Sequence, residues 1–262
     1  MTRTPDESSM SARSTTWRRW EAISELGDPD VVLRQAAADR RRANHSSEVA
    51  PMGWYRYSSS ANRLKRLLDV TISASLLAIA APLFAVLALA IRLTSPGPAF
   101  FHQVRMGFAE QPFVVWKFRT MATDNDNEIH RKYVTAQLRG EISTSPDGTF
   151  KLTSDPRVTP LGRWLRRTSL DELPQLYNVL RGEMSLVGPR PSLPYEVEYY
   201  SADHRFRALS MPGLTGLWQV EGRNELSMLD ALDIDLDYVT SCSLRGDLAI
   251  LAKTFRVVFS GF

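Results

Sequence analysis

One long apolar run stands out from the pattern of hydrophobic and polar positions along the chain. Residues 70–91 read VTISASLLAIAAPLFAVLALAI and contain no charged side chain. As a straight helix this run would extend roughly 33 Å, enough for a hydrocarbon core about 30 Å thick. Pro82 lies in its middle, where proline removes a backbone hydrogen bond and kinks or breaks a helix. A break there leaves arms of about 18 and 15 Å, and neither could cross the membrane alone.

Basic residues flank the apolar run on both sides. Positively charged residues close to a membrane segment prefer the cytoplasmic side. Both ends carry them here: Arg56, Arg63, Lys65 and Arg66 before the run, and Arg92 and Arg105 after it. A helix that enters the membrane, turns at Pro82 and returns satisfies both flanks. The residues alone leave three interpretations open: this re-entrant helix, a kinked single span, and a buried helix of a soluble protein.

The remaining pattern divides the chain into three parts. Residues 1–60 show no sustained apolar period, which is typical of a mostly disordered tail, here a basic one. Residues 61–95 contain the apolar helix, and residues 96–262 form a compact domain. Within that domain, β-branched and aromatic residues at 111–118 predict a strand, with residues 100–105 as its partner in a small hairpin. Helices are expected in a segment opened by Asp124, Asp126 and Glu128, and at 170–180, 193–209, 227–240 and 246–259. The expected fold class is therefore α+β, mainly helical.

Composition narrows the functional classes only a little. The net charge of +3 and the pI near 9.1 suit anionic lipid headgroups, nucleotides or nucleic acid without choosing among them. A single cysteine, Cys242, excludes an internal disulfide and fits a reducing compartment. The four histidines are far apart in the sequence, and no His-x-x-x-His or Cys-x-x-Cys spacing occurs. A zinc site is therefore not expected.

Two adjacent carboxylates, Asp171 and Glu172, follow closely behind a pair of arginines. Ser169 and Glu172 have the spacing of a capping box, and acidic residues in a first helical turn are stabilised by the helix dipole. For an isolated pair that structural interpretation would be sufficient. More cations lie nearby than a cap requires: Arg166, Arg167, Arg181 and Arg190. Carboxylates that bind a metal or attack phosphorus, surrounded by guanidinium groups, suit phosphoryl transfer.

Two further segments carry groups suited to a nucleotide. Lys117 and Arg119 lie two apart at the end of the predicted strand, so we expect them to share one face that suits a diphosphate. Charges that protect an edge strand are the alternative. Residues 212–224 form a glycine-punctuated loop whose tryptophan and polar side chains suit a nucleoside, with an ordinary turn as the alternative. The candidate substrate-binding residues of this loop are Thr215, Gln219 and Arg223.

A second acidic group reads Asp233-Ile234-Asp235-Leu236-Asp237. It resembles the metal-binding Asp-x-Asp of many glycosyltransferases. On a helix these residues spread over different faces, so a polar helix face is the favoured interpretation. Neither a Gly-x-x-x-x-Gly-Lys-Ser/Thr phosphate loop nor a Gly-x-Gly-x-x-Gly fingerprint occurs in the chain,.

Taken in order, the motifs of residues 63–253 resemble those of the bacterial sugar transferases. These are monotopic polyprenyl-phosphate phosphoglycosyl transferases, and the type in question initiates exopolysaccharides by undecaprenyl-phosphate hexose-1-phosphate transfer. The matching segments are Lys65-Arg66-Leu67-Leu68-Asp69, the proline-interrupted apolar helix, Gly97-Pro98-Ala99-Phe100-Phe101, Gln103-x-Arg105-x-Gly107, Lys117-Phe118-Arg119-Thr120-Met121, Thr168-Ser169-Leu170-Asp171-Glu172-Leu173-Pro174-Gln175, Val187-Gly188-Pro189-Arg190-Pro191 and Pro212-Gly213-Leu214-Thr215-Gly216. So many motifs in one order make the resemblance highly specific.

The resemblance implies a reaction and its residues. A UDP-sugar and polyprenyl phosphate give polyprenyl-diphosphate-sugar and UMP. Asp171 is then the nucleophile that forms an aspartyl-phosphosugar, and Asp171 with Glu172 is expected to hold Mg²⁺, the implied cofactor. Arg166 and Arg190 are candidates for binding phosphates, and Lys117, Arg119, Thr215, Gln219 and Arg223 for other parts of the substrate.

The resemblance also implies a location. It favours the re-entrant helix, turned at Pro82, and a catalytic domain on the cytoplasmic face of the bacterial inner membrane. The expected partners are the UDP-sugar, undecaprenyl phosphate and membrane lipids, without nucleic acid; a homo-oligomer stays open. Two alternatives of other kinds are an Asp-x-Asp glycosyltransferase that releases UDP and a catalytically inactive membrane adaptor.

The chain departs from the family pattern at two places. Family members often have serine before the proline, whereas this chain has Ala81 and therefore lacks a hydroxyl that could bond to the freed carbonyl. The segment Gly216-Leu217-Trp218-Gln219 stands where some relatives have tryptophan directly after the glycine. This form resembles enzymes that transfer glucose- or galactose-phosphate, so one of these two sugars is the expected one.

Overall fold

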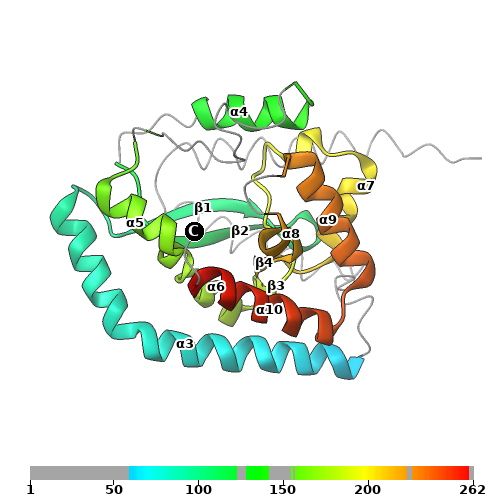
Figure 1. Ribbon diagram of the computed structural model, residues 1–262, viewed down its shortest axis with the longest axis horizontal. Helices are drawn as coiled ribbons and strands as arrows, with labels where there is room; N and C mark the ends of the chain where they lie inside the picture. The colour runs from blue at the N-terminus through cyan, green and yellow to red at the C-terminus, as the bar shows by residue number, and fades with distance from the viewer. Residues whose placement is uncertain (1–58, 123–127, 142–154, 156, 223–225, 260–262) are drawn as a thin grey trace, which may run out of the picture.

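The computed structural model describes residues 59–122, 128–141, 155, 157–222 and 226–259. Nearly all of the predicted tail, residues 1–60, therefore lies outside the described residues, as does Arg223. The described part is mainly helical, with a two-stranded antiparallel sheet and a two-stranded parallel pair. Its element order starts with the apolar helix and ends with the helix α10 (Figure 1). The predicted α+β class, mainly helical, is confirmed.

The apolar run forms α3 (Ser59–Thr94), 36 residues long. The helix continues through Pro82 and is bent into two arms (Figure 1), so the expectation of a broken helix is corrected to a kinked one. Proline is the usual cause of such a kink. Among the described helices, α3 is the one long and apolar enough to cross a membrane, and only 11% of its most apolar stretch is buried. That exposure argues against a buried helix of a soluble protein.

Polar contacts fasten the first arm of α3 to the domain. Lys65 Nζ lies 2.7 Å from Asp247 Oδ2, and Asp69 Oδ1 accepts a hydrogen bond from the Leu186 backbone at 3.0 Å. Arg66 donates to the carbonyls of Val179 and Leu180 at 2.6 and 2.8 Å, near the end of α6 (Gln175–Arg181). Lys65 and Asp69 are one helical turn apart, so one polar stripe of an otherwise apolar helix faces the domain.

The predicted hairpin is confirmed. Strands β1 (Phe100–Met106) and β2 (Pro112–Phe118) pair antiparallel, from Phe100 opposite Phe118 to Met106 opposite Pro112. The outer edge of β2 is covered by Asn178 of α6, whose amide accepts from the Trp116 backbone N–H at 3.1 Å and donates to the Val114 carbonyl at 2.6 Å. A single side chain thus replaces a neighbouring strand and blocks an open edge.

The parallel pair was not predicted. Strands β3 (Ser185–Val187) and β4 (Gly213–Thr215) are three residues long, too short for an alternating pattern to show. Gly213 is required there because a Cβ on it would lie 2.1 Å from the Gly188 nitrogen. The pair therefore brings two glycine-containing motifs into backbone contact.

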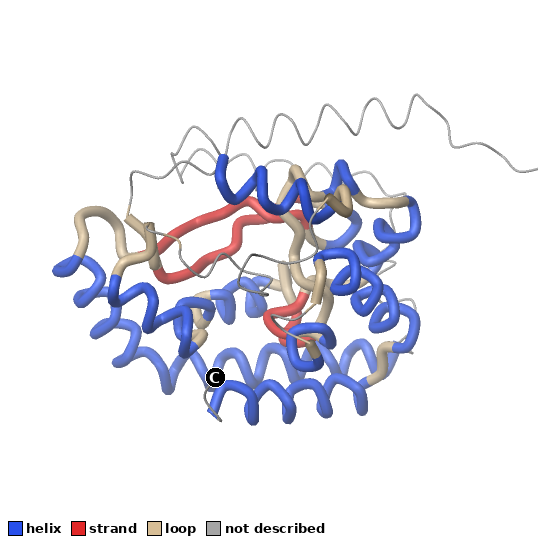
Figure 2. Tube along the Cα trace, turned by 45° about the horizontal axis from the view of Figure 1, so that its top comes forward, coloured by secondary structure: helices blue, strands red, loops and turns tan. Residues whose placement is uncertain are grey.

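Helices and short 3₁₀ turns complete the domain, arranged around the hairpin (Figures 1 and 2). Of the predicted helices, 227–240 and 246–259 correspond to α9 and α10, whereas 193–209 is divided into three short pieces. The helix α5 was missed. The remaining elements are α4 (Glu128–Leu138), α5 (Pro160–Thr168), η3 (Leu170–Glu172), η4 (Val197–Tyr199), α7 (Ala202–Arg205), η5 (Phe206–Leu209), α8 (Leu217–Glu221), α9 (Met228–Ser241) and α10 (Leu244–Phe259), with η2 (Phe108–Glu110) in the hairpin turn.

Candidate active site

The helix α5 directly precedes the acidic pair in the chain and positions it. Thr159 caps it by accepting from the Gly162 N–H at 2.9 Å, and Pro160 occupies its first turn. Gly162 packs so closely that a Cβ on it would lie 2.0 Å from the Thr120 carbonyl oxygen. Leu165 is fully buried in a cluster with Leu87 and Ile91 of α3 and Phe118 of β2. The helix is therefore fixed between the end of the hairpin and the second arm of α3.

Asp171 follows α5 on the 3₁₀ turn η3, and not at a capped helix start. Ser169 adopts a left-handed conformation with φ of 56° and ends α5; its side chain makes no cap hydrogen bond. The predicted capping box is therefore wrong, because the chain is already helical before Ser169 and must turn there. This turn leaves Asp171 8% exposed, whereas the Glu172 side chain is 35% exposed.

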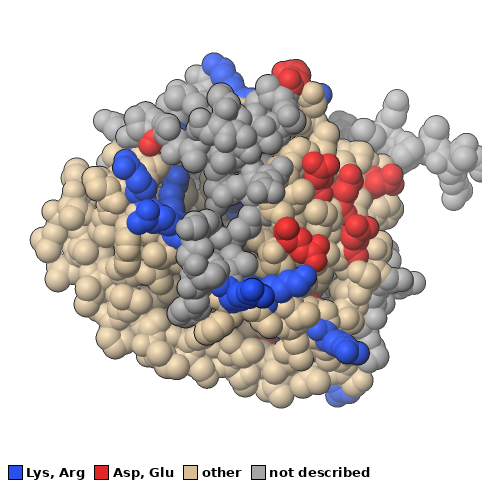
Figure 3. Space-filling model, in the orientation of Figure 1, with Lys and Arg blue, Asp and Glu red and all other residues tan. Residues whose placement is uncertain are grey.

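Two of the predicted cations lie beside this acidic pair. Lys117 Nζ is 3.0 Å from Glu172 Oε1, and Arg166 Nε donates to Thr120 Oγ1 at 2.9 Å. Burial lowers the pKa of Arg166, while the nearby charge of Asp171 raises it. Lysine and arginine side chains gather at the left of the molecule, over α5 and the end of the hairpin (Figure 3). The structure thus brings Lys117, Arg166, Asp171 and Glu172 together.

Arg119 does not join this group. Its guanidinium donates to the carbonyls of Pro96 and Ser95 at 2.6 and 2.8 Å and to Ser95 Oγ at 2.8 Å. The residue is 5% exposed. The expectation that Lys117 and Arg119 present one diphosphate-binding face is therefore corrected: Lys117 faces Glu172, whereas Arg119 fixes the chain that leaves α3.

The structure adds an ion pair that the sequence did not single out. Arg157 donates from Nε and Nη2 to both carboxylate oxygens of Asp155, at 2.6–3.0 Å. Both side chains are largely buried. Asp155 and Arg157 influence the pKa of Arg166, so the pair belongs to the surroundings of Asp171. A short Asp-x-Arg spacing carries no sequence signal strong enough to predict this.

Arg190 lies at a second cationic centre. Its Nη1 is 3.6 Å from Oε1 of the fully buried Glu196. Burial and the neighbouring Arg190 lower the pKa of Arg105 to about 10, whereas Glu196 and Glu172 raise it. Arg105 thus feels the charges of both centres. It donates to the Pro191 carbonyl at 3.0 Å, next to Arg190 in the chain.

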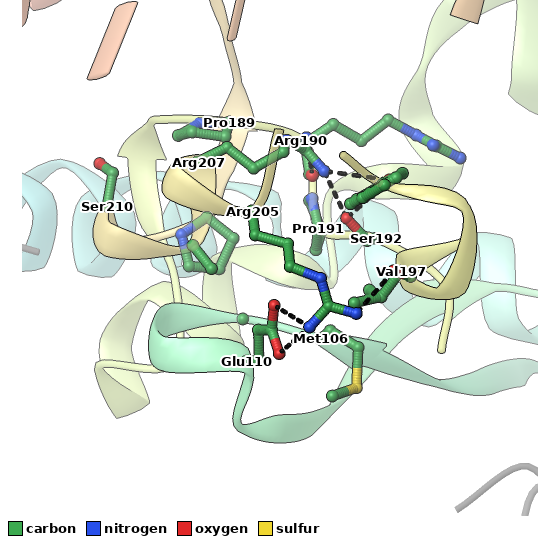
Figure 4. A pocket seen from close by; sticks show the side chains of 14 residues that line it. Met106, Glu110, Pro189, Arg190, Pro191, Ser192, Val197, Arg205, Arg207 and Ser210 are labelled. Carbon is green, nitrogen blue, oxygen red and sulfur yellow. Dashed lines mark hydrogen bonds and ion pairs between the residues drawn. The ribbon is translucent and has the colours of Figure 1, made fainter. Parts of the chain in front are cut away.

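A hollow that is open to solvent lies at the turn end of the hairpin, and Arg190 is part of its lining. Figure 4 shows Arg205 within it, between Glu110 and Val197. Neither Asp171 nor Glu172 lines this hollow. The candidate active site is therefore identified by the carboxylates and cations gathered at Asp171, and not by this hollow.

The two remaining loop candidates that the structure describes lie on different elements, Thr215 on β4 and Gln219 on α8. Thr215 is buried and its hydroxyl lies 2.8 Å from that of Thr254. Gln219 belongs to the helix α8, as does Trp218, which is 7% exposed and packs in the core. Stacking of a nucleobase on Trp218 is therefore not supported.

The Asp-x-Asp group forms no metal site. Asp235 is 1% exposed and pairs with Arg207. Asp233 Oδ1 lies 3.0 Å from His204 Nε2, and Asp237 is exposed one helical turn further along the same face of α9,. Among the described residues, no three His, Cys, Asp or Glu side chains converge as metal ligands. The favoured interpretation of a polar helix face describes Asp233 and Asp237, whereas Asp235 is a buried partner of Arg207.

Comparison with known proteins identifies the family. A model of the bacterial sugar transferases matches residues 60–261. The chain belongs to the bacterial sugar transferase family. This confirms the resemblance drawn from the ordered motifs, which included the Asp171–Glu172 and Arg190 segments.

Three relatives of this sugar transferase illustrate the match. The undecaprenyl-phosphate galactose phosphotransferase of Salmonella typhimurium is 42% identical over 199 residues, which cover 76% of this chain and 41% of that protein. The UDP-glucose:undecaprenyl-phosphate glucose-1-phosphate transferase of Caulobacter vibrioides is 44% identical over 199 residues, 72% and 67% of the two chains. The exopolysaccharide production protein ExoY of Rhizobium meliloti is 40% identical over 194 residues, 74% and 84%. The chain thus spans less than half of the first relative.

Proposed function

We propose that this sugar transferase moves a sugar 1-phosphate from a UDP-sugar to undecaprenyl phosphate and releases UMP. The observation that carries the proposal is the nearly buried Asp171, placed on a turn beside Arg166 and next to the Lys117–Glu172 ion pair. A carboxylate held among fixed cations can approach an anionic phosphate that it would otherwise repel.

Asp171 is the proposed nucleophile. One of its carboxylate oxygens attacks the phosphorus that carries the sugar, a new phosphorus–oxygen bond forms, and the bond to the bridging oxygen breaks. UMP leaves with that electron pair, and an aspartyl-phosphosugar remains. An oxygen of the lipid phosphate then attacks the same phosphorus and releases the Asp171 carboxylate unchanged. Two in-line displacements of this kind need no net proton transfer.

The residues at the site fit a magnesium ion. Mg²⁺ is typically held by one or two carboxylates together with substrate phosphates and water, and Asp171 and Glu172 supply two carboxylates. The Lys117–Glu172 and Asp155–Arg157 ion pairs already engage one cation each with a carboxylate, so Mg²⁺ would add positive charge for an arriving diphosphate. When bound, the ion would offset charge on the diphosphate and on the leaving UMP.

The re-entrant topology of α3 is part of this proposal. Lys65, near the start of the helix, contacts Asp247, and the chain beyond its end at Thr94 is held by Arg119 of the same domain. A straight span would place these two ends on opposite sides of a membrane. If both ends lie on one side, the basic flanks favour the cytoplasmic face of the inner membrane for the domain, where a soluble nucleotide sugar meets a lipid phosphate.

Cysteine labelling tests this topology. In a Cys242→Ser background, single thiols introduced at Ser60 and Glu141, both exposed, should react only from the cytoplasmic side. Labelling of one from each side would establish a single span and contradict the re-entrant helix.

The names of the relatives favour glucose or galactose as the sugar and exopolysaccharide synthesis as the pathway. Purified protein, undecaprenyl phosphate and Mg²⁺ with a panel of UDP-sugars test the reaction by the nucleotide released. We expect UMP with UDP-glucose or UDP-galactose. Release of UDP would instead establish glycosyl transfer and contradict the proposal.

A further inference from the structure

The Asp155–Arg157 ion pair takes no direct part in the reaction proposed above. It lies on a segment that runs alongside the end of the hairpin: the Ala122 N–H donates to the Arg157 carbonyl at 3.1 Å, and the Thr159 N–H to the Thr120 carbonyl at 3.0 Å. Met121 and Val158 form an isolated antiparallel bridge between the same two segments. Backbone contacts therefore fix this ion pair relative to Thr120.

Thr120 is also the residue that orients Arg166, through the 2.9 Å bond from Nε to Oγ1. One short stretch of backbone thus holds the Asp155–Arg157 pair on one side and Arg166 on the other. Arg166 lies within electrostatic range of Asp155 and Arg157 and also of Asp171 and Glu172. It is therefore the side chain that both the ion pair and the proposed nucleophile influence.

Several hydrogen bonds fix the geometry of the pair. Asp155 accepts from Nε and Nη2 of Arg157 and also from its backbone N–H at 3.0 Å, which fixes the side chain in one orientation. Ion pairs with little exposure contribute little net stability, because desolvation of both charges offsets their attraction. Two guanidinium groups near one another also repel. Asp155 offsets this repulsion, and its pKa is lowered by Arg157 and Arg166 together.

We propose that the Asp155–Arg157 pair is a positioning element of the active site, which holds the Arg166 guanidinium in the orientation that serves Asp171 and the donor diphosphate. The proposal rests on the phosphoglycosyl transfer proposed above. Asp155 acts through Arg166: its carboxylate fixes Arg157 and offsets its charge beside Arg166. Arg166 can then keep its bond to Thr120 and remain beside the acidic pair.

The test is a double-mutant cycle on UMP release, with Asp155→Asn, Arg166→Lys and both together. We expect Asp155→Asn to lower kcat about 10- to 100-fold, as loss of a residue that orients a catalytic group does, with KM for the UDP-sugar changed less than threefold. In the Arg166→Lys background the same change should lower kcat less than threefold, because the group it orients is already lost.

Further variants separate positioning from folding. Asp155→Glu keeps the carboxylate and should recover much of the loss, and Arg157→Gln should reproduce the effect of Asp155→Asn if that variant does not fold. Glu141→Gln removes a surface ion pair with Arg139 and serves as the matched control, with kcat within twofold of the unmodified protein.

Two results would overturn the inference. One is a kcat for Asp155→Asn within twofold of the unmodified protein. The other is an equal fractional loss in both backgrounds together with a lower Tm, which would make the pair a purely structural element. An inactive unmodified protein across the UDP-sugar panel would contradict the proposed function itself, and the two failures are therefore distinguishable.

Discussion

Two acidic regions of this protein look alike in sequence and differ in the structure. The Asp171–Glu172 pair fits a helix cap, and the Asp233–Asp235–Asp237 series fits a metal-binding motif. In the folded chain, Asp171 lies nearly buried beside Arg166. Asp235 instead forms a buried ion pair with Arg207, and Asp233 contacts His204. The spacing of acidic residues in the sequence suggests a site at both places. The cations around each carboxylate, and the partners that these cations have, distinguish the candidate active site from a buried ion pair.

The comparison extends to charge at the surface. Basic side chains gather over α5 and the end of the hairpin, whereas acidic side chains gather over α9 (Figure 3). An anionic nucleotide sugar is attracted to the first region and repelled by the second. The four substitutions below test this contrast, from the largest expected effect to the smallest.

Asp171→Asn should abolish turnover. The amide keeps the shape of the side chain but cannot form the phosphorus–oxygen bond, so we expect UMP release to fall at least about 10³-fold. The nucleotide assay measures this, and an unchanged Tm shows that the fold is kept. Activity near that of the unmodified protein would show that Asp171 is not the nucleophile and has a structural role only.

Asp235→Asn should affect stability far more than chemistry. It leaves the buried Arg207 guanidinium without its carboxylate, and loss of one partner of a buried pair costs about 3–5 kcal/mol. Denaturant unfolding measures the loss, and the kcat of the folded fraction should stay within a few-fold of the original. An inactive but stable variant would favour the Asp-x-Asp alternative.

Arg166→Lys should lower kcat roughly 10- to 100-fold. The lysine retains a positive charge but loses the planar fork that can bind Thr120 and a phosphate together. Steady-state kinetics with the UDP-sugar measure the change. Activity equal to that of the unmodified protein would show that a charge alone suffices at this position.

Asp237→Asn should change nothing measurable. The side chain is exposed on α9, and surface substitutions away from special features stay within about 0.5 kcal/mol. This variant has the same chemical change as Asp171→Asn, which makes it the matched control in the same assay. A clear loss of turnover would mean that α9 takes part in substrate binding.

Local signals predicted the elements that depend on local chemistry. The β-branched and aromatic stretch before Phe118 predicted β2, and the polar–apolar period after Ser227 predicted α9, which begins with a capping box at that serine. Thr159-Pro160 carries the same kind of start signal for α5, whereas Ser169, which has the spacing of a cap, ends that helix.

Other features depend on contacts between distant segments, and the sequence could not supply them. Arg119 bonds to Ser95 and Pro96 because the end of β2 meets the end of α3. Asp155 joins the site because its segment runs beside Thr120. The partners of Arg119 and the position of Asp155 follow from tertiary packing. The acidic pair Asp171–Glu172 could be predicted because several arginines lie near it in the sequence.

The covalent intermediate is the most direct test of the account. Purified protein is mixed with Mg²⁺ and the active UDP-sugar in the absence of lipid phosphate, and intact-protein and peptide mass spectrometry follow. The account predicts an added hexose phosphate on the peptide that contains Asp171, lost on addition of undecaprenyl phosphate and absent from Asp171→Asn. Full turnover by a protein that never carries this adduct would contradict the proposed role of Asp171.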